Sequence, residues 1–266
     1  MTATTIMLDG RGCPGRTFSR MARLPQIRFD EWDDSPRTRR TAAGLGRDEV
    51  RVWLAAIPPG EDALAGWLPL LSPEERRRAE RFSVSEPRRQ FVFGRVCLRQ
   101  MLGACLGLNP AALALNLQPH GKPCLARPGG GGPDVRFNLS HSGRRLAMVL
   151  ARGRDVGVDV ERIHPLKDEA LLAGRIFSPR EQAEWRSLPE AQQRTAFFNG
   201  WTRKEAWLKA TGEGLIDDRA AIEVTLAPGK EAAWLALPGG PQVRREWAVR
   251  ALPLPPDYAG AVVVKR

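Results

Sequence analysis

The chain has 266 residues, 42% of them hydrophobic and 27% charged, and its formal net charge at pH 7 is +11. This balance is typical of one large globular domain or two small ones and excludes a disordered or fibrous protein. The longest uncharged stretch, residues 100–121, is interrupted by Asn and Pro residues, so we expect no membrane span. The basic excess favours a polyanionic partner such as nucleic acid, an anionic membrane, a phosphorylated small molecule or an acidic protein.

The start of the chain gives no sign of a secretory signal, because charged residues interrupt any apolar core there. The four cysteines form no C-x-x-C pair and have no histidine at zinc spacing. We therefore expect a cytoplasmic protein with buried thiols. Residues 1–48 show no sustained hydrophobic period, and we expect a flexible N-terminal extension there.

Regular elements are predicted from residue 51 onward. Residues 52–57 predict a strand, and Ser72-Pro73-Glu74-Glu75 predicts a capping box at the start of a helix that ends near residue 82. A second helix is predicted over residues 86–106, with apolar residues on one face. Further strands are predicted over residues 113–117, 135–139, 146–150 and 156–160, separated by Gly and Pro turns.

The last third of the chain repeats this order. A helix near residues 167–177 precedes a second capping box, Ser178-Pro179-Arg180-Glu181, and a long helix is predicted over residues 189–211, ending at Gly212. The tail is predicted to be mostly β, with strands near Ile222, Trp234, Trp247 and Val262.

A shift of the chain by 106 residues brings similar residues into register. The matched pairs are Val52 with Val158, Ile57 with Ile163, Ser72 with Ser178, Glu75 with Glu181, Phe91 with Phe197, Gly94 with Gly200 and Leu102 with Leu208. Strand, capping box and long helix keep the same order in both copies. We therefore expect an α+β fold of two similar halves, residues 49–155 and 156–266, related by a pseudo-twofold axis with the active site in the cleft between them.

Two acidic residues, two positions apart in the sequence, lie at the end of the strand predicted over residues 156–160. Asp159 and Glu161 point from the same face of this strand, where two convergent carboxylates attract a cation; the alternative is a solvated strand face. In the long helix, Glu205 and Lys209 are one turn apart on the same stripe as Trp201. The alternative for this pair is a surface salt bridge.

Two turn segments carry further polar groups. Asn138-Leu139-Ser140-His141-Ser142-Gly143 leaves a strand into a turn whose hydroxyls, backbone N–H groups and imidazole can surround a phosphate. His141 is equally an ordinary loop or core histidine. Gly121-Lys122-Pro123 is a second turn, and its alternative is an exposed lysine without a role.

Taken together, these segments resemble the 4′-phosphopantetheinyl transferases of the pseudo-dimeric, surfactin-synthetase-activating (Sfp-like) type. The resemblance covers roughly residues 50–265. It is carried by Gly121-Lys122-Pro123, by Phe137 to Gly143, by Gly157-Val158-Asp159-Val160-Glu161 and by Trp201-Thr202-Arg203-Lys204-Glu205-Ala206-Trp207-Leu208-Lys209. It implies Mg²⁺-dependent transfer of the 4′-phosphopantetheine arm of coenzyme A to a serine of an acyl or peptidyl carrier protein, with release of 3′,5′-ADP.

The resemblance also implies roles for single residues. Asp159, Glu161 and Glu205 match the metal ligands, Glu205 also matches the base for the carrier serine, and Lys209 matches the lysine that contacts the phosphates. The residues expected to hold coenzyme A are Lys122, Ser140, His141, Lys204 and Arg78.

The chain departs from the family in the first capped helix. Glu75 and Arg78 stand where relatives have two lysines for the nucleotide 3′-phosphate, and Arg88 or Arg89 is an alternative partner for that phosphate. The 106-residue shift places Trp53, Ala55 and Arg99 at the positions of the three carboxylates. We therefore expect one active site per chain, and a monomer.

The partner implied by the resemblance is a carrier protein, which we expect to be acidic because the chain is basic. The basic candidates for its docking are Arg144, Arg145, Arg203 and the helix with Arg76 to Arg81. The alternative function is a basic nucleic-acid-binding module. A single tyrosine and the lack of basic residues interleaved with aromatic ones argue against that alternative.

Overall fold

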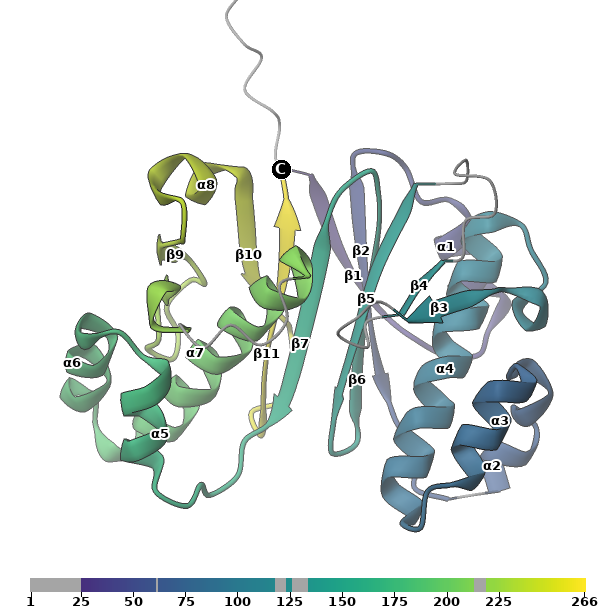
Figure 1. Cartoon of the computed structure of the whole chain (residues 1–266), viewed down its shortest axis with the longest axis horizontal. Coiled ribbons are helices and arrows are strands. Elements are labelled where there is room, and N and C mark those ends of the chain that lie inside the picture. Colours follow the sequence, from purple (N-terminus) through teal and green to yellow (C-terminus); the bar gives the residue numbers. More distant parts are fainter. Residues whose placement is uncertain (1–24, 61, 118–122, 126–133, 213–218) are drawn as a thin grey trace, which may run out of the picture.

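The computed structural model describes residues 25–60, 62–117, 123–125, 134–212 and 219–266, and it has mixed α+β architecture (Figure 1). The strands are β1 (Gln26–Glu31), β2 (Glu49–Ala56), β3 (Leu115–Leu117), β4 (Pro123–Leu125), β5 (Val135–Ser142), β6 (Arg145–Arg152), β7 (Val156–Arg162), β8 (Glu223–Val224), β9 (Trp234–Ala236), β10 (Trp247–Ala251) and β11 (Tyr258–Lys265). The helices are α1 (Pro36–Ala43), α2 (Asp62–Ala65), α3 (Pro73–Glu80), α4 (Ser85–Leu106), α5 (Glu169–Ile176), α6 (Pro179–Ser187), α7 (Glu190–Thr211) and α8 (Gly240–Glu246). The α+β class predicted from the sequence is confirmed.

Two sheets lie between two long helices. One sheet has the strand order β1-β2-β6-β5 and is covered by α4, and the other has the order β10-β11-β7 and is covered by α7 (Figure 1). Strand β1 is parallel to β2, whereas β6 is antiparallel to both of its neighbours, β2 and β5, and β11 is antiparallel to both β10 and β7. Alternate residues of β2 and β7 fill a third core between the sheets: Val50, Val52 and Leu54 meet Val156, Val158 and Val160. Such period-two burial follows from the pleat of a strand.

Both capping boxes form as predicted. The hydroxyls of Ser72 and Ser178 accept hydrogen bonds from the third helical N–H of α3 and α6, and the glutamate at that position bonds back to the serine N–H. Each box precedes a helix of 22 residues that ends at a glycine in the left-handed region, Gly107 after α4 and Gly212 after α7. Glycine adopts this conformation without the cost that a Cβ imposes.

Each capping-box glutamate also receives a basic side chain from the following long helix. Arg99 Nε lies 2.7 Å from Glu75 Oε2, and Lys204 Nζ lies 2.6 Å from Glu181 Oε2. Both cations then donate to backbone carbonyls, Arg99 to Pro110 and Leu113, and Lys204 to Ile176 and Arg219. Helices α4 and α7 begin and end 105 residues apart in the sequence, whereas the two capping boxes are 106 residues apart. In the structure Arg99 therefore corresponds to Lys204, and the expected match of Arg99 with Glu205 is wrong.

Residues 25–48 contain regular structure where we expected a flexible extension over residues 1–48, and residues 1–24 lie outside the described part of the chain. Strand β1 extends the first sheet from its edge, and α1 begins at the Ser35 N-cap with Pro36 in its first turn. Ala42 and Leu45 are buried in the core under α4. The sequence pattern missed these elements because β1 is mostly exposed at a sheet edge and α1 has a short apolar face. Helix α8 likewise interrupts the tail that was predicted to be mostly β.

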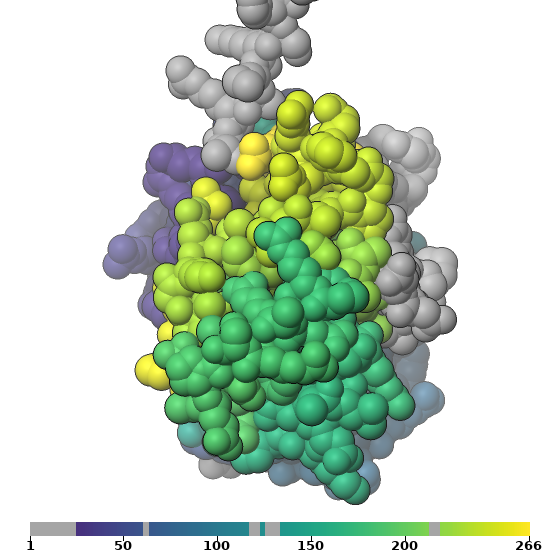
Figure 2. Space-filling view, turned by 90° about the vertical axis from the view of Figure 1, so that its left-hand side faces the viewer, coloured from purple at the N-terminus to yellow at the C-terminus, as the bar shows by residue number. Residues whose placement is uncertain are grey.

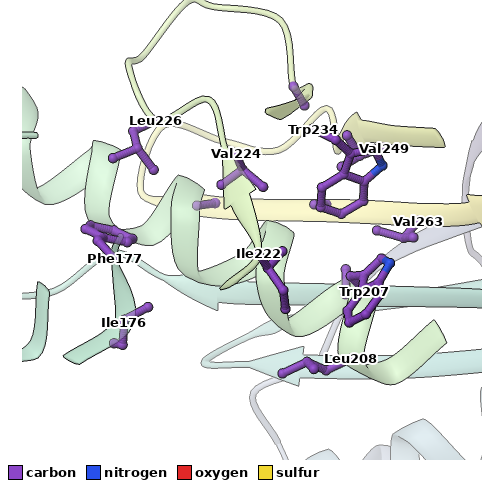
Figure 3. Close-up of a cluster of buried hydrophobic side chains, with 14 of the residues drawn as sticks. Ile176, Phe177, Trp207, Leu208, Ile222, Val224, Leu226, Trp234, Val249 and Val263 are labelled. Carbon is purple, nitrogen blue, oxygen red and sulfur yellow. The ribbon is translucent and has the colours of Figure 1, made fainter. Parts of the chain in front are cut away.

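Helix α7 is covered on most sides. The segments from α5 to α8 form the outer surface of this half (Figure 2), and Thr202, Arg203 and Lys204 are buried with the apolar residues of the helix. Trp207 of α7 packs in one cluster with Trp234, Val249 and Val263 (Figure 3). No helix in the described part of the chain is both long and apolar enough to span a bilayer.

The Lys204–Glu181 pair gives a test of this packing. Replacement of Lys204 by Ala leaves the buried Glu181 carboxylate without its cation, so we expect a loss of about 3–5 kcal/mol in the free energy of unfolding. Lys230→Ala is the matched control, since Lys230 pairs with Glu184 at the surface and should cost less than about 1 kcal/mol. Urea unfolding of both variants measures the difference, and equal costs would contradict the assigned burial.

Candidate active site

The two sheets are joined along their facing edges by side chains of β5. Asn138 Oδ1 accepts the Val158 N–H at 2.8 Å, Ser140 Oγ accepts the Val160 N–H at 3.4 Å, and Ser142 Oγ accepts the Arg162 N–H at 3.1 Å. We call this set of contacts the β5–β7 seam. An edge strand presents unpaired N–H groups, and here alternate polar side chains satisfy them in place of a neighbouring backbone.

The serines of the seam also donate to the acidic residues of β7. Ser140 Oγ lies 2.8 Å from Asp159 Oδ1, and Ser142 Oγ lies 2.7 Å from Glu161 Oε2. Each hydroxyl therefore fixes one backbone N–H and one carboxylate at the same time. The structure thus brings together Asp159, Glu161 and Ser140 as the sequence predicted.

Asp159 is 2% exposed and lies against a lysine of α7. Lys209 Nζ is 2.6 Å from Asp159 Oδ1 and 3.0 Å from Ser140 Oγ. The second oxygen, Asp159 Oδ2, is buried and has no hydrogen-bond partner in the described part of the chain. A buried carboxylate oxygen without a donor is costly unless a cation or ligand approaches it.

The second acidic residue of β7, Glu161, has a raised pKa. Burial raises the pKa of Glu161, and the Asp159 charge adds to this rise, although the Ser142 hydrogen bond opposes it.

Glu205 lies one turn before Lys209 on α7, but it has a different partner. Arg219 Nε is 2.9 Å from Glu205 Oε1, and the Arg219 guanidinium also lies over the Trp201 ring, 5.7 Å from its centroid. Both side chains of this ion pair are largely shielded from solvent. The alternative considered for this pair, a surface salt bridge between Glu205 and Lys209, is not formed, because Lys209 pairs with Asp159 and Glu205 with Arg219. Among the described residues, no three His, Cys, Asp or Glu side chains are close enough to hold a metal ion as they stand.

Gly157 explains how α7 comes close enough for Lys209 to reach Asp159. A Cβ built on Gly157 would overlap the carbonyl oxygen of Ala206 and the backbone of Ala210. Only a residue without a side chain permits this contact between β7 and α7. The glycine therefore belongs to the same constellation as the two acidic residues that follow it in the strand.

A hollow of about 190 Å³ lies on the other side of β5, where His141 faces α3 and α4. It is lined in part by Arg78, Phe91 and Arg95, and both guanidinium groups lie over the Phe91 ring, at 5.0 and 5.5 Å from its centroid. The surrounding protein partly desolvates the exposed His141 ring and lowers its pKa, and the Lys209 ammonium lowers it further. Both effects favour the uncharged form of the His141 ring.

A second hollow of about 460 Å³ continues past Arg78 and Arg95 to the first capping box. Glu75 lines it but is bound by Arg99, so its charge is neutralised within the protein. A third hollow, of about 370 Å³, is lined by residues of both predicted halves, among them Pro123, Phe137, Val156 and Ala210.

Several predicted positions lie elsewhere. The Lys204 ammonium is fully buried against Glu181, so the expectation that it holds coenzyme A is wrong. Arg203 is buried too, with its guanidinium donating to Thr225, and burial lowers its pKa to about 10. It is therefore no exposed docking charge. Lys122 lies outside the described residues.

Three residues of the site were missed by the sequence analysis. Arg95 stands one helical turn after Phe91, and this spacing places both on the face of α4 that lines the hollow. Ser142 continues the period-two series of Asn138 and Ser140, so the alternation of polar residues was the available signal. Arg219 has no such signal, because only tertiary packing brings it to Glu205.

Comparison with known proteins identifies the family of this chain. A family model described as "4'-phosphopantetheinyl transferase superfamily" matches residues 155–263, and one described as "4'-phosphopantetheinyl transferase, N-terminal" matches residues 57–152. The 4'-phosphopantetheinyl transferase HetI of Nostoc sp. is 40% identical over 189 residues, which cover 70% of this chain and 77% of that protein. The 4'-phosphopantetheinyl transferase Sfp of Bacillus subtilis is 28% identical over 158 residues, which cover 59% and 67%.

Among solved structures, a complex of ACPS with CoA from Chronobacterium ammoniagenes superposes with a TM-score of 0.31 at 24% identity, over 43% of this chain and 98% of that one. The sequence matches assign the family. The chain belongs to the 4′-phosphopantetheinyl transferase superfamily, with relatives of the Sfp-like type, and it is an enzyme of this class. The resemblance noted in the sequence is confirmed.

The close approach of α7 to β7 predicts the effect of a single methyl group. Gly157→Ala should lower the free energy of unfolding by about 1–3 kcal/mol or more, because the methyl group overlaps the backbone of α7. Gly174→Ala is the control, since a Cβ there meets nothing within 4 Å and alanine favours the helix. Urea unfolding compares them, and the control should be unchanged or more stable.

Proposed function

We propose that the chain transfers the 4′-phosphopantetheine arm of coenzyme A to a serine hydroxyl of a carrier protein, releasing 3′,5′-ADP. The observation that carries this proposal is the buried Asp159 carboxylate beside Glu161, which binds Lys209 through one oxygen and whose other oxygen has no hydrogen-bond partner among the described residues. A site that combines carboxylates with an ammonium suits a metal-bound pyrophosphate. Membership of the transferase family supports the same reaction.

The donor set fits Mg²⁺. This cation prefers oxygen ligands and is commonly held by one or two carboxylates together with substrate phosphates. Asp159 and Glu161 would supply protein oxygens from β7, and Glu205 would add a third after exchanging its bond to Arg219. When bound, the cation would neutralise charge on the pyrophosphate during the transfer.

The remaining steps are assigned to side chains of α7. Glu205 would accept the proton of the carrier serine, because a hydroxyl attacks phosphorus poorly until a base removes its proton. Lys209, whose ammonium already lies at Asp159, would stabilise negative charge on the phosphates in the in-line transition state.

Coenzyme A would be held on the β5 side of the site. His141 is at the hollow lined by Arg78 and Arg95, and these two arginines are suited to the 3′-phosphate. Arg95 thereby takes the place that the sequence analysis gave to Arg88 or Arg89. Lys122 and Ser140 remain expected partners of coenzyme A, although Ser140 already bonds to Lys209 and Asp159.

We further propose that the two halves are related by a pseudo-twofold axis, with the active site in the cleft between them. Equivalent valines of β2 and β7 meet in one central core, and equivalent ion pairs follow both capping boxes. The first half has the fully buried Trp53 at the repeat position of Asp159, so a second metal site is not expected. One site per chain supports a monomer.

The decisive experiment incubates an apo carrier protein with the chain, coenzyme A and Mg²⁺ and measures its intact mass. The native chain should add one phosphopantetheine arm, and Asp159→Ala should abolish transfer because the cation that would bind the pyrophosphate loses a protein ligand. Excess chelator should also stop the native enzyme. Full activity of Asp159→Ala in chelator would contradict the proposal.

Glu205 and Lys209 are tested by the size of their effect. As catalytic groups, each should lower turnover by about a hundredfold or more in Glu205→Gln and Lys209→Ala. If they served only as ion-pair partners, both variants would keep near-native turnover and differ from the native chain in stability alone. Turnover and urea unfolding of the same preparations distinguish these outcomes.

The partner is proposed to be an acidic carrier protein, because exposed arginines surround the site. Arg78 and Arg144 are exposed, and Arg76 and Arg77 lie on the same helix as Arg78. Rising ionic strength should raise the KM for the carrier more than the KM for a short serine peptide, since charges in water are screened within about 10 Å at 0.1 M salt. Both KM values are measured across a salt series, and equal dependence would assign the basic excess to another role.

A further inference from the structure

Ser142 has no assigned role, yet it makes two contacts at the candidate active site. Its hydroxyl accepts the Arg162 N–H at 3.1 Å and donates to Glu161 Oε2 at 2.7 Å. A hydroxyl has one proton to donate, so accepting a backbone N–H directs that proton toward the carboxylate. The Glu161 side chain is thereby held from the neighbouring strand.

The contact is specific in geometry because it repeats one step along the seam. Ser140 accepts the Val160 N–H and donates to Asp159, in the same relation that Ser142 has to Arg162 and Glu161. Asp159 accepts hydrogen bonds from both Ser140 and Lys209, whereas the bond described for Glu161 comes from Ser142. The orientation of Glu161 therefore depends more on Ser142 than the orientation of Asp159 depends on Ser140.

We propose that Ser142 is a positioning residue that orients Glu161 for the divalent cation. This inference rests on the proposed function, in which Glu161 is a metal ligand. The bond from Ser142 occupies Oε2 and leaves Oε1 available to the cation. Hydrogen bonds to ligating carboxylates fix their orientation, and their removal commonly weakens metal binding by about 10–100-fold.

A purely structural role of Ser142 predicts a different result. The Arg162 N–H lies at an exposed part of the strand, so water can replace the hydroxyl as its acceptor. Loss of the hydroxyl should therefore change the stability of the fold little. A positioning role predicts instead a loss of metal affinity in a protein that is still folded.

The experiment titrates the protein and coenzyme A with Mn²⁺ and follows the free ion by electron paramagnetic resonance. Ser142→Ala should weaken Mn²⁺ binding about tenfold or more and raise the KM for Mg²⁺ more than it lowers kcat. Ser142→Thr keeps the hydroxyl on a strand position and should bind Mn²⁺ within about twofold of the native chain. Ser187→Ala is the control, because it removes a hydroxyl that donates to the Glu184 carbonyl at the end of α6, at a distance in sequence from the acidic residues of β7.

Native Mn²⁺ affinity in Ser142→Ala would overturn the positioning role while leaving the transferase proposal intact. Equal loss in the Ala and Thr variants would also overturn it, since the hydroxyl would then not be the responsible group. A native chain that neither binds Mn²⁺ nor modifies an apo carrier would refute the proposed function itself. Should Ser142→Ala unfold, Ser142→Cys takes its place, because a thiol nearly keeps the volume of the side chain but donates only weakly; native Mn²⁺ affinity in that variant would overturn the positioning role.

Discussion

The edges of two sheets meet along the β5–β7 seam, where hydrogen bonds come from side chains instead of a backbone ladder. Asn138, Ser140 and Ser142 accept N–H groups of β7, and the two serines donate to Asp159 and Glu161. Polar groups buried at such a junction need partners, because each unsatisfied group costs free energy comparable to a lost hydrogen bond. The requirement that closes the junction therefore also fixes the carboxylates of the site.

The helix α7 completes this arrangement from the opposite side. Gly157 lets its backbone approach β7, and Lys209 then reaches Asp159 and Ser140. Lys204 of the same helix binds Glu181 of α6 in the core, and this ion pair fixes the position of α7 relative to α6. Two lysines five residues apart thus have different tasks, one in the packing of the half and one at the site, because they leave the helix in different directions.

The two halves use one set of packing devices and differ at the positions that matter for chemistry. Capping box, long helix, left-handed glycine and buried ion pair occur in both. Trp53 and Ala55 of β2 are buried apolar residues, whereas Asp159 and Glu161 of β7 are acidic. Strand β7 therefore carries two carboxylates where β2 carries buried apolar residues, and this difference is the reason that we propose one site per chain.

The sequence by itself determined the local structure and the family. Both capping boxes, the two long helices, the strands β5, β6 and β7 and the acidic pair two residues apart follow from spacing, because caps and hydrophobic periods act within a few residues. Tertiary structure alone decided what those spacings leave open. It incorporated β1 and α1 into the first half, buried Lys204 and paired Arg219 with Glu205. These contacts join residues far apart in the chain or turn a side chain inward, and no local period encodes such choices.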